Sequence, residues 1–101
     1  MKGITLVVGL GKSGLSAARA LRALDAAFAV TDSRANPPGL AALQAECPEV
    51  PRYLGGFDPA AFASAARLLV SPGVSVRTPV IAAAAARGVP VWGDIELLAR
   101  L

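Results

Sequence analysis

The sequence predicts a doubly wound α/β fold, in which helices cover both faces of a parallel β-sheet. Short apolar runs alternate with alanine-rich runs of helical spacing, and Gly, Pro, Asp or Asn marks the changes between them. A glycine loop also joins the first apolar run to the first helical run. Because right-handed crossovers join parallel strands, we expect a five-stranded, Rossmann-like sheet of order 3-2-1-4-5. The length of 101 residues fits a single domain.

The first strand and the first helix are predicted at residues 4–8 and at about 13–25. Residues 4–8 are continuously apolar, which is typical of the central strand of a parallel sheet. In the next run, apolar and small residues recur at helical spacing, whereas Arg19 and Arg22 point the opposite way. The helix face that we expect to pack on the sheet contains Gly14, Ala17, Leu21 and Leu24.

A second strand is predicted at residues 28–31 and a second helix at residues 37–46. Two prolines open this helix, and Asn36 is its expected N-cap. Residues 50–54 form a weaker third strand. We place it at the sheet edge because Pro51 has no N–H group to donate.

The second half of the chain continues the alternation. An Asp-Pro pair opens a helix at residues 58–65, and a buried strand follows at residues 68–71. A Thr-Pro pair opens the next helix, at residues 78–88, before a last strand at residues 89–92. A final helix is predicted at residues 94–101 and has no termination signal. We therefore expect a domain cut from a longer protein.

Composition excludes several classes of site. With no histidine and one cysteine, Cys47, the chain holds no Ser/His/Asp triad, no histidine-ligated zinc and no internal disulfide. Cys47, expected at the surface, is interpreted as incidental. The net charge is +3, but no two Lys or Arg are adjacent, so no nucleic-acid partner is expected. No apolar run approaches the roughly 18 residues of a membrane span and no signal peptide is seen, so we expect a cytoplasmic protein without a membrane partner.

The glycine loop, GLGKSG, follows a predicted strand and opens a predicted helix in the GxGxxG pattern. Gly9 permits the tight turn, Gly11 lets the backbone approach a phosphate, and Gly14 lets the helix lie close to the strand. N–H groups at the helix N-terminus attract an anion, and Lys12 can help to neutralise a diphosphate. A Walker A loop is not expected, because Leu6 occupies the position of its first glycine. The alternative is a turn needed only for packing.

Two further polar segments lie where the second and fourth predicted strands end. Ligands of doubly wound sheets bind outside the carboxyl ends of the strands, so these segments should converge with the glycine loop. An acid eighteen residues after Gly14 can accept hydrogen bonds from a ribose, but this spacing does not separate NAD from another nucleotide. Plain turns and a surface arginine are the alternatives. The candidate binding residues of the two segments are Asp32, Ser33, Arg34, Ser71, Pro72 and Gly73.

In order, the segments GLGKSG, DSR, LGG-x-D, VSPGV and GVPVWGDIELL resemble the N-terminal domain of the Mur ligases, in particular of the members that add D-glutamate. The resemblance covers essentially the whole chain, and SPGV followed by GDIEL is its most specific part. It implies that residues 1–101 hold the UDP part of UDP-N-acetylmuramoyl-L-alanine in peptidoglycan-precursor synthesis. The resemblance places Lys12 and Ser13 near the diphosphate and uridine, Asp32, Ser33 and Arg34 around the uracil, and Ser71, Pro72 and Gly73 along the nucleotide site.

The resemblance also implies what this chain lacks. In the family, a central domain uses ATP and Mg²⁺ to activate the substrate carboxylate as an acyl phosphate, and a C-terminal domain positions D-glutamate. Neither domain is expected within this chain, so we expect no cofactor, no catalytic residue and no ligase turnover from it alone. From the residues without the resemblance, an NAD(H)-binding module of an oxidoreductase or of a nucleotide-sensing regulator fits equally well. A packing domain with no ligand is the third interpretation.

Overall fold

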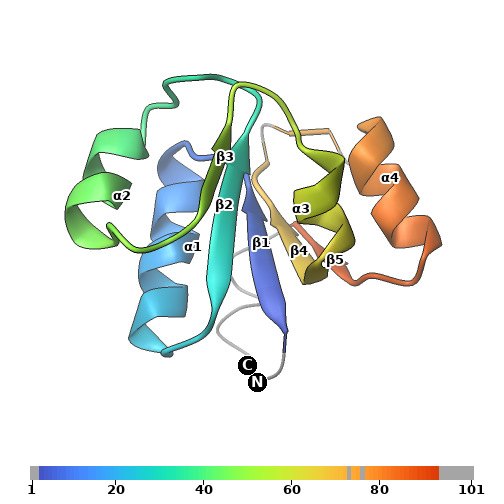
Figure 1. Ribbon diagram of the computed structural model, residues 1–101, viewed down its shortest axis with the longest axis horizontal. Helices are drawn as coiled ribbons and strands as arrows, with labels where there is room; N and C mark the ends of the chain where they lie inside the picture. Colours follow the sequence, from blue (N-terminus) through green and yellow to red (C-terminus); the bar gives the residue numbers. More distant parts are fainter. Residues whose placement is uncertain (1–2, 73, 76, 94–101) are drawn as a thin grey trace.

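Five parallel strands form one sheet in the order β3-β2-β1-β4-β5, which confirms the predicted fold class and strand order (Figure 1). This computed structural model describes residues 3–72, 74–75 and 77–93. The elements in chain order are β1 (Ile4–Val8), α1 (Lys12–Ala23), β2 (Phe28–Asp32), α2 (Leu40–Glu46), β3 (Arg52–Leu54), α3 (Pro59–Ala63), β4 (Ala65–Val70), α4 (Pro79–Ala86) and β5 (Val91–Trp92).

Strand β1 is the centre of the sheet, because it pairs with β2 on one side and with β4 on the other. Its side chains alternate between two buried clusters. Val7 faces the cluster under α1 and α2, whereas Leu6 and Val8 face the cluster under α3 and α4. Burial on both faces explains why this strand is continuously apolar.

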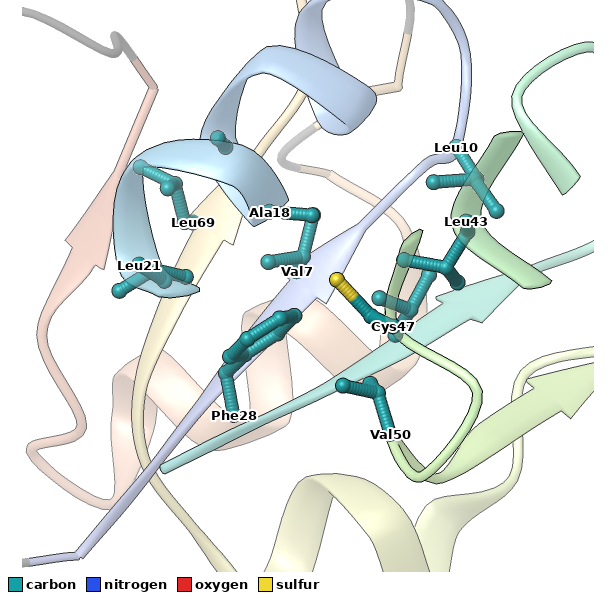
Figure 2. Packing of buried hydrophobic residues seen from close by; sticks show 11 residues of the cluster. Val7, Leu10, Ala18, Leu21, Phe28, Leu43, Cys47, Val50 and Leu69 are labelled. Carbon is teal, nitrogen blue, oxygen red and sulfur yellow. The ribbon is translucent and has the colours of Figure 1, made fainter. Parts of the chain in front are cut away.

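The cluster under α1 and α2 joins those two helices to the sheet (Figure 2). Figure 2 shows Val7, Phe28 and Leu69 of the sheet near Ala18 and Leu21 of α1, with Leu10, Leu43, Cys47 and Val50 beside them. The thiol of Cys47 points into this cluster, and the residue is only 1% exposed. The expectation of a surface cysteine was therefore wrong: the residue ends α2 on the side that faces the sheet.

Helix α1 is shorter than expected at its C-terminal end. It ends at Ala23, and Leu24 is 53% exposed, although the spacing placed Leu24 on the packed face. Asp25 has a φ of 55°, so the chain leaves the helix axis directly after Leu24. The side chain therefore lies beyond the last turn that contacts the sheet.

Helix α2 begins at Leu40, three residues after the expected start at Pro37, and Asn36 is not its N-cap. The backbone N–H of Gly39 donates to the carbonyl of Leu10 at 2.9 Å, which ties this segment to the glycine loop. Residues 37–40 form a turn instead, closed by a hydrogen bond from the Leu40 N–H to the Pro37 carbonyl. The first helical hydrogen bond runs from the Leu43 N–H to the Gly39 carbonyl, so the helix begins after this turn.

The remaining elements are those predicted, with different bounds. Strand β4 begins at Ala65, where it pairs with Ile4, and not at residue 68, so Ala65 belongs to the strand and α3 ends at Ala63. Strand β4 ends at Val70, one residue before the predicted end, and β5 begins at Val91, two residues later than predicted. Asp58 caps α3 by accepting a hydrogen bond from the Ala60 N–H at 2.9 Å, and Thr78 occupies the N-cap position of α4. The short strand β3 lies at the sheet edge, as Pro51 suggested. The helix predicted at residues 94–101 lies outside the described residues. Among those described, no helix is both long and apolar enough to cross a membrane.

Candidate functional site

A hollow of about 340 Å³ lies at the carboxyl ends of the central strands, the upper edge of the sheet in Figure 1. It is at the switch point of the topology, where the chain connects from the β1–β2–β3 side to β4. The residues that line it are Gly9, Gly11, Lys12, Ser13, Asp32, Ser33, Arg34, Phe57, Ser71, Pro72 and Val74.

The structure brings together the three segments that the sequence singled out. The glycine loop, the residues after β2 and the residues after β4 all contribute to the wall of this hollow. Of the predicted binding residues, all line it except Gly73, which lies outside the described residues. Gly14 lines a smaller neighbouring hollow of about 150 Å³, which shares Ser13, Ser71 and Pro72 with the larger one.

The three glycines of the loop differ in what they allow. Gly9 has a φ of 95°, a conformation that other residues rarely adopt. A side chain at Gly14 would collide with the carbonyl of Gly9, so this glycine lets α1 approach the end of β1. At Gly11, an added Cβ would meet no protein atom within 4 Å, because this position faces the open hollow.

The N-terminus of α1 gives the hollow a positive end. The first hydrogen bond of the helix runs from the Leu15 N–H to the Gly11 carbonyl. The N–H groups of Lys12, Ser13 and Gly14 therefore have no acceptor within the helix, and the aligned peptide dipoles add a partial positive charge. With the exposed Lys12 ammonium beside them, these groups favour an anion.

The carboxylate of Asp32 is saturated by the protein itself. One oxygen accepts from the backbone N–H and Nε of Arg34 at 2.8 and 2.9 Å. The other accepts from the Leu10 N–H and from Nη2 of Arg34, both at 2.7 Å. These hydrogen bonds use the roughly four acceptor positions of a carboxylate and tie the glycine loop to the end of β2.

The environment of Asp32 keeps it ionised. Burial acts to raise the pKa of this carboxyl, since the residue is only 2% exposed. The hydrogen bonds from the Arg34 side chain and from the backbones of Leu10 and Arg34 outweigh burial and lower the pKa to about 2. At neutral pH the loop is therefore held by a full negative charge.

The carboxylate of Asp32 fixes the orientation of the Arg34 guanidinium. Two nitrogens of this guanidinium donate to Asp32, and the hydrogen bond to Asp32 raises the pKa of the guanidinium. The Arg34 side chain is still 54% exposed and lines the hollow. Beside it, Ser33 is exposed and also lines the hollow, so both offer donors to a ligand.

Ser71 joins the end of β4 to the glycine loop. Its hydroxyl donates to the carbonyl of Gly9 at 3.0 Å, and its backbone N–H donates to the Val8 carbonyl at 2.9 Å. The carbonyl of Ser71 accepts from the Val74 N–H at 2.9 Å, which closes the turn after the strand. This serine therefore fixes the distance between two walls of the hollow.

Two lining residues, Phe57 and Val74, were not predicted from the sequence. Val74 follows the Ser-Pro-Gly segment, and Phe57 follows two glycines after β3. Both come after the carboxyl end of a parallel strand, where ligand contacts gather. That position was the available signal, but an isolated apolar residue in a loop was not distinguished from core.

The glycine loop does not have the Walker A pattern of an ATP-binding loop. None of the described residues build a group of three or more Asp, Glu, Cys or His side chains that could hold a metal ion. The position that a Walker A loop needs for its first glycine is Leu6, which is buried in β1. The glycine loop can therefore bind a phosphate at the N-terminus of α1, but it does not have the sequence of a Walker A loop.

Comparisons with known proteins give a consistent result. The family model described as Mur ligase MurD-like, N-terminal domain, matches residues 3–93. The chain is 56% identical over 95 residues to a protein of Nitrosococcus oceani and to one of Marinobacter nauticus. It is 52% identical to one of Pseudomonas aeruginosa. All three are named UDP-N-acetylmuramoylalanine–D-glutamate ligase, and each alignment covers 94% of this chain but 21% of the relative. The chain therefore spans about a fifth of the length of these relatives.

Proposed function

The chain belongs to the family of Mur ligase MurD-like N-terminal domains, and on this premise we propose that it binds the UDP part of UDP-N-acetylmuramoyl-L-alanine. One observation carries the proposal. The glycine loop, the residues after β2 and the residues after β4 converge on one hollow at the switch point of the sheet. The relatives are named for a UDP-linked substrate, and the hollow offers the chemistry to hold a nucleoside diphosphate.

The two ends of the hollow suit the two parts of such a ligand. The diphosphate lies against the N-terminus of α1, where Gly11 leaves room and the N–H groups of Lys12 and Ser13 donate. The uracil lies near Ser33 and Arg34, whose donors face the same hollow. Asp32 acts through its partners: it positions Arg34 and the backbone of Leu10 rather than contacting the ligand.

The state of Asp32 also argues against an NAD(H)-binding module. In a dinucleotide-binding fold, the acid at the end of the second strand accepts hydrogen bonds from the ribose hydroxyls. Here one carboxylate oxygen already accepts two hydrogen bonds from Arg34, and the other accepts one from Leu10 and one from Arg34. A ribose could bind Asp32 only by displacing hydrogen bonds from Leu10 or Arg34 to this buried carboxylate, so we do not favour an NAD(H)-binding function.

We further propose that the chain acts as the substrate-binding domain of an ATP-dependent ligase that adds D-glutamate in the cytoplasm. In this proposal, ATP and Mg²⁺ are bound by other domains of such an enzyme. The chain alone should therefore give no turnover. Formation of ADP by this chain that depends on both UDP-N-acetylmuramoyl-L-alanine and D-glutamate would refute this part of the proposal.

The binding proposal is tested by an NMR titration of the isotope-labelled chain with UDP, UDP-N-acetylmuramoyl-L-alanine, NAD and ATP. Saturable shifts at the amides of Gly11, Ser13 and Ser33 are expected with the two uridine ligands, and little change with NAD or ATP. Shifts with NAD but not with UDP would contradict the proposal, and so would no response to either uridine ligand.

A matched pair of variants locates the diphosphate. Lys12→Ala removes a positive charge at the N-terminus of α1, and Arg87→Ala removes one at the C-cap of α4, at the opposite edge of the sheet. Both side chains are exposed, so neither change should affect folding. UDP affinity should fall only in Lys12→Ala. An equal effect of both variants would indicate attraction by net charge instead of a site.

A further inference from the structure

Phe57 contributes an aromatic side chain to the lining of the hollow. Among the described residues that line the hollow, it is the one aromatic side chain, and it shares that lining with Ser33 and Arg34. The residue is half-buried, so part of the ring packs on the protein and part faces outward. The side chain packs against the cluster under α3 and α4 and also lines the hollow, so it offers apolar surface to a ligand there.

The backbone places Phe57 beside the end of β2. The N–H of Gly55 donates to the Arg34 carbonyl at 3.1 Å, and that of Gly56 donates to the Asp32 carbonyl at 3.5 Å. Gly55 and Gly56 have φ values of 81° and 145°, which other residues rarely adopt. The two glycines therefore turn the chain after β3 back toward the sheet, as its path above the strands in Figure 1 shows.

The Phe57 ring packs against a second aromatic side chain, Phe62. Phe57 and Phe62 meet edge to face, with their ring centroids 5.8 Å apart and their planes at 75°. Phe62 is only 2% exposed and belongs to the cluster under α3 and α4. Its position is fixed by the core, so Phe57 packs against a rigid neighbour.

We propose that Phe57 is the platform on which the base of a nucleoside diphosphate packs, while the diphosphate lies at the N-terminus of α1. The inference rests on the proposed function and adds to it a residue that determines affinity. Nearby, two hydrogen bonds to Asp32 fix the orientation of the Arg34 guanidinium. The base would therefore contact two side chains, Phe57 and Arg34, whose positions are set before the ligand binds. Rigid flat groups lose little conformational entropy when a ligand binds.

The test compares UDP affinity and NMR contacts in four proteins: the unchanged chain, Phe57→Leu, Phe57→Tyr and the control Tyr53→Leu. Tyr53 is an exposed aromatic on β3 that does not line the hollow, so its replacement matches the change at Phe57. Phe57→Leu keeps apolar volume against Phe62 but removes the flat ring. Its affinity should fall by roughly 5- to 150-fold, the range that one stacked base contributes. Phe57→Tyr and Tyr53→Leu should bind nearly as the unchanged chain does.

Nuclear Overhauser contacts between the Phe57 ring and uracil H5 and H6 are expected in the UDP complex of the unchanged chain. UDP binding with no such contacts, or with equal affinity in Phe57→Leu, would overturn this inference and leave the proposed function intact. An equal loss in Tyr53→Leu would also overturn it. No UDP binding by the unchanged chain would refute the proposed function itself, and this inference with it.

Discussion

Replacing Asp32 by Asn removes the charge that joins the glycine loop to the end of β2. The carboxylate accepts four hydrogen bonds, two from backbone N–H groups and two from the Arg34 guanidinium. An Asn side chain offers one oxygen and one NH₂ group, so half of these donors would face another donor. Leaving a buried donor unpaired costs about 1–3 kcal/mol, and the guanidinium also loses its counterion.

The pKa of Asp32 gives a second, independent value for its contribution to the free energy of unfolding. Its pKa is about 2 in the folded protein, against the ordinary 3.8, so folding favours the ionised form. This lowering of the pKa contributes about 2 kcal/mol to the free energy of unfolding. Because the folded pKa is the lower one, the contribution is fully present above about pH 5 and is lost as the pH falls through 3.8 toward 2.

We therefore expect Asp32→Asn to lower the free energy of unfolding by about 2–3 kcal/mol at pH 7. The difference from the unchanged chain should shrink by about 2 kcal/mol between pH 5 and pH 2, because only the unchanged chain loses the linked contribution. Urea unfolding, followed by circular dichroism at a series of pH values, measures both quantities.

The control is Glu46→Gln. Glu46 also accepts two hydrogen bonds from an arginine, Arg19, at 2.9 and 2.7 Å, but both side chains are exposed. Exposed pairs are screened by water, so this change should have a much smaller effect on stability. Equal stability of Asp32→Asn and the unchanged chain at pH 7 would refute the reasoning. A stability difference that stays constant from pH 7 to pH 2 would refute the linkage to pKa.

Four further substitutions test other contacts, with urea unfolding as the measurement. Gly14→Ala should destabilise the fold by at least about 2 kcal/mol, because the new methyl group collides with the Gly9 carbonyl. Gly11→Ala faces open space, so it should change stability by less than about 1 kcal/mol but weaken UDP binding in a titration. Ser71→Ala loses the hydrogen bond to the Gly9 carbonyl and should cost about 1 kcal/mol. Phe62→Ala empties a buried site and should cost about 3–5 kcal/mol.

Each of these expectations has a contrary result. Native stability in Gly14→Ala would mean that α1 does not approach the end of β1 as closely as described, and a large loss in Gly11→Ala would mean that this position is not open. Unchanged UDP affinity in Gly11→Ala would place the ligand elsewhere. A neutral effect of Ser71→Ala would show that the hydroxyl does not hold the two walls together, and a loss below about 1 kcal/mol in Phe62→Ala would contradict its place in the core.

The sequence by itself determined the fold class, the strand order and the three segments that meet at the hollow. The alternation of apolar and helical runs gives parallel strands joined by helices, and the handedness of the connections leaves few possible orders. The carboxyl ends of parallel strands lie at one edge, so Ser33, Arg34 and Ser71 had to gather near the glycine loop. These inferences depend on local periodicity and chain direction, which a sequence records directly.

The tertiary structure decided everything that depends on contacts between distant residues. A turn at residues 37–40 precedes α2, the C-terminal end of α2 places Cys47 in the core, and Leu24 lies beyond the last turn of α1. The spacing suggested a ribose contact for Asp32, but its carboxylate oxygens already accept hydrogen bonds from Arg34 and from the N–H of Leu10.

Phe57 shows the same limit at the site. Nothing in its sequence neighbourhood distinguishes a residue that lines a hollow from one in the core, and its place follows from Gly55 pairing with Arg34 and from Phe62 behind the ring. Helix and strand formation depends on residues within a few positions of one another, whereas the partners of a buried charge or ring depend on how whole elements pack. The elements could thus be derived from the sequence, and the roles of Asp32 and Phe57 only from the packed structure.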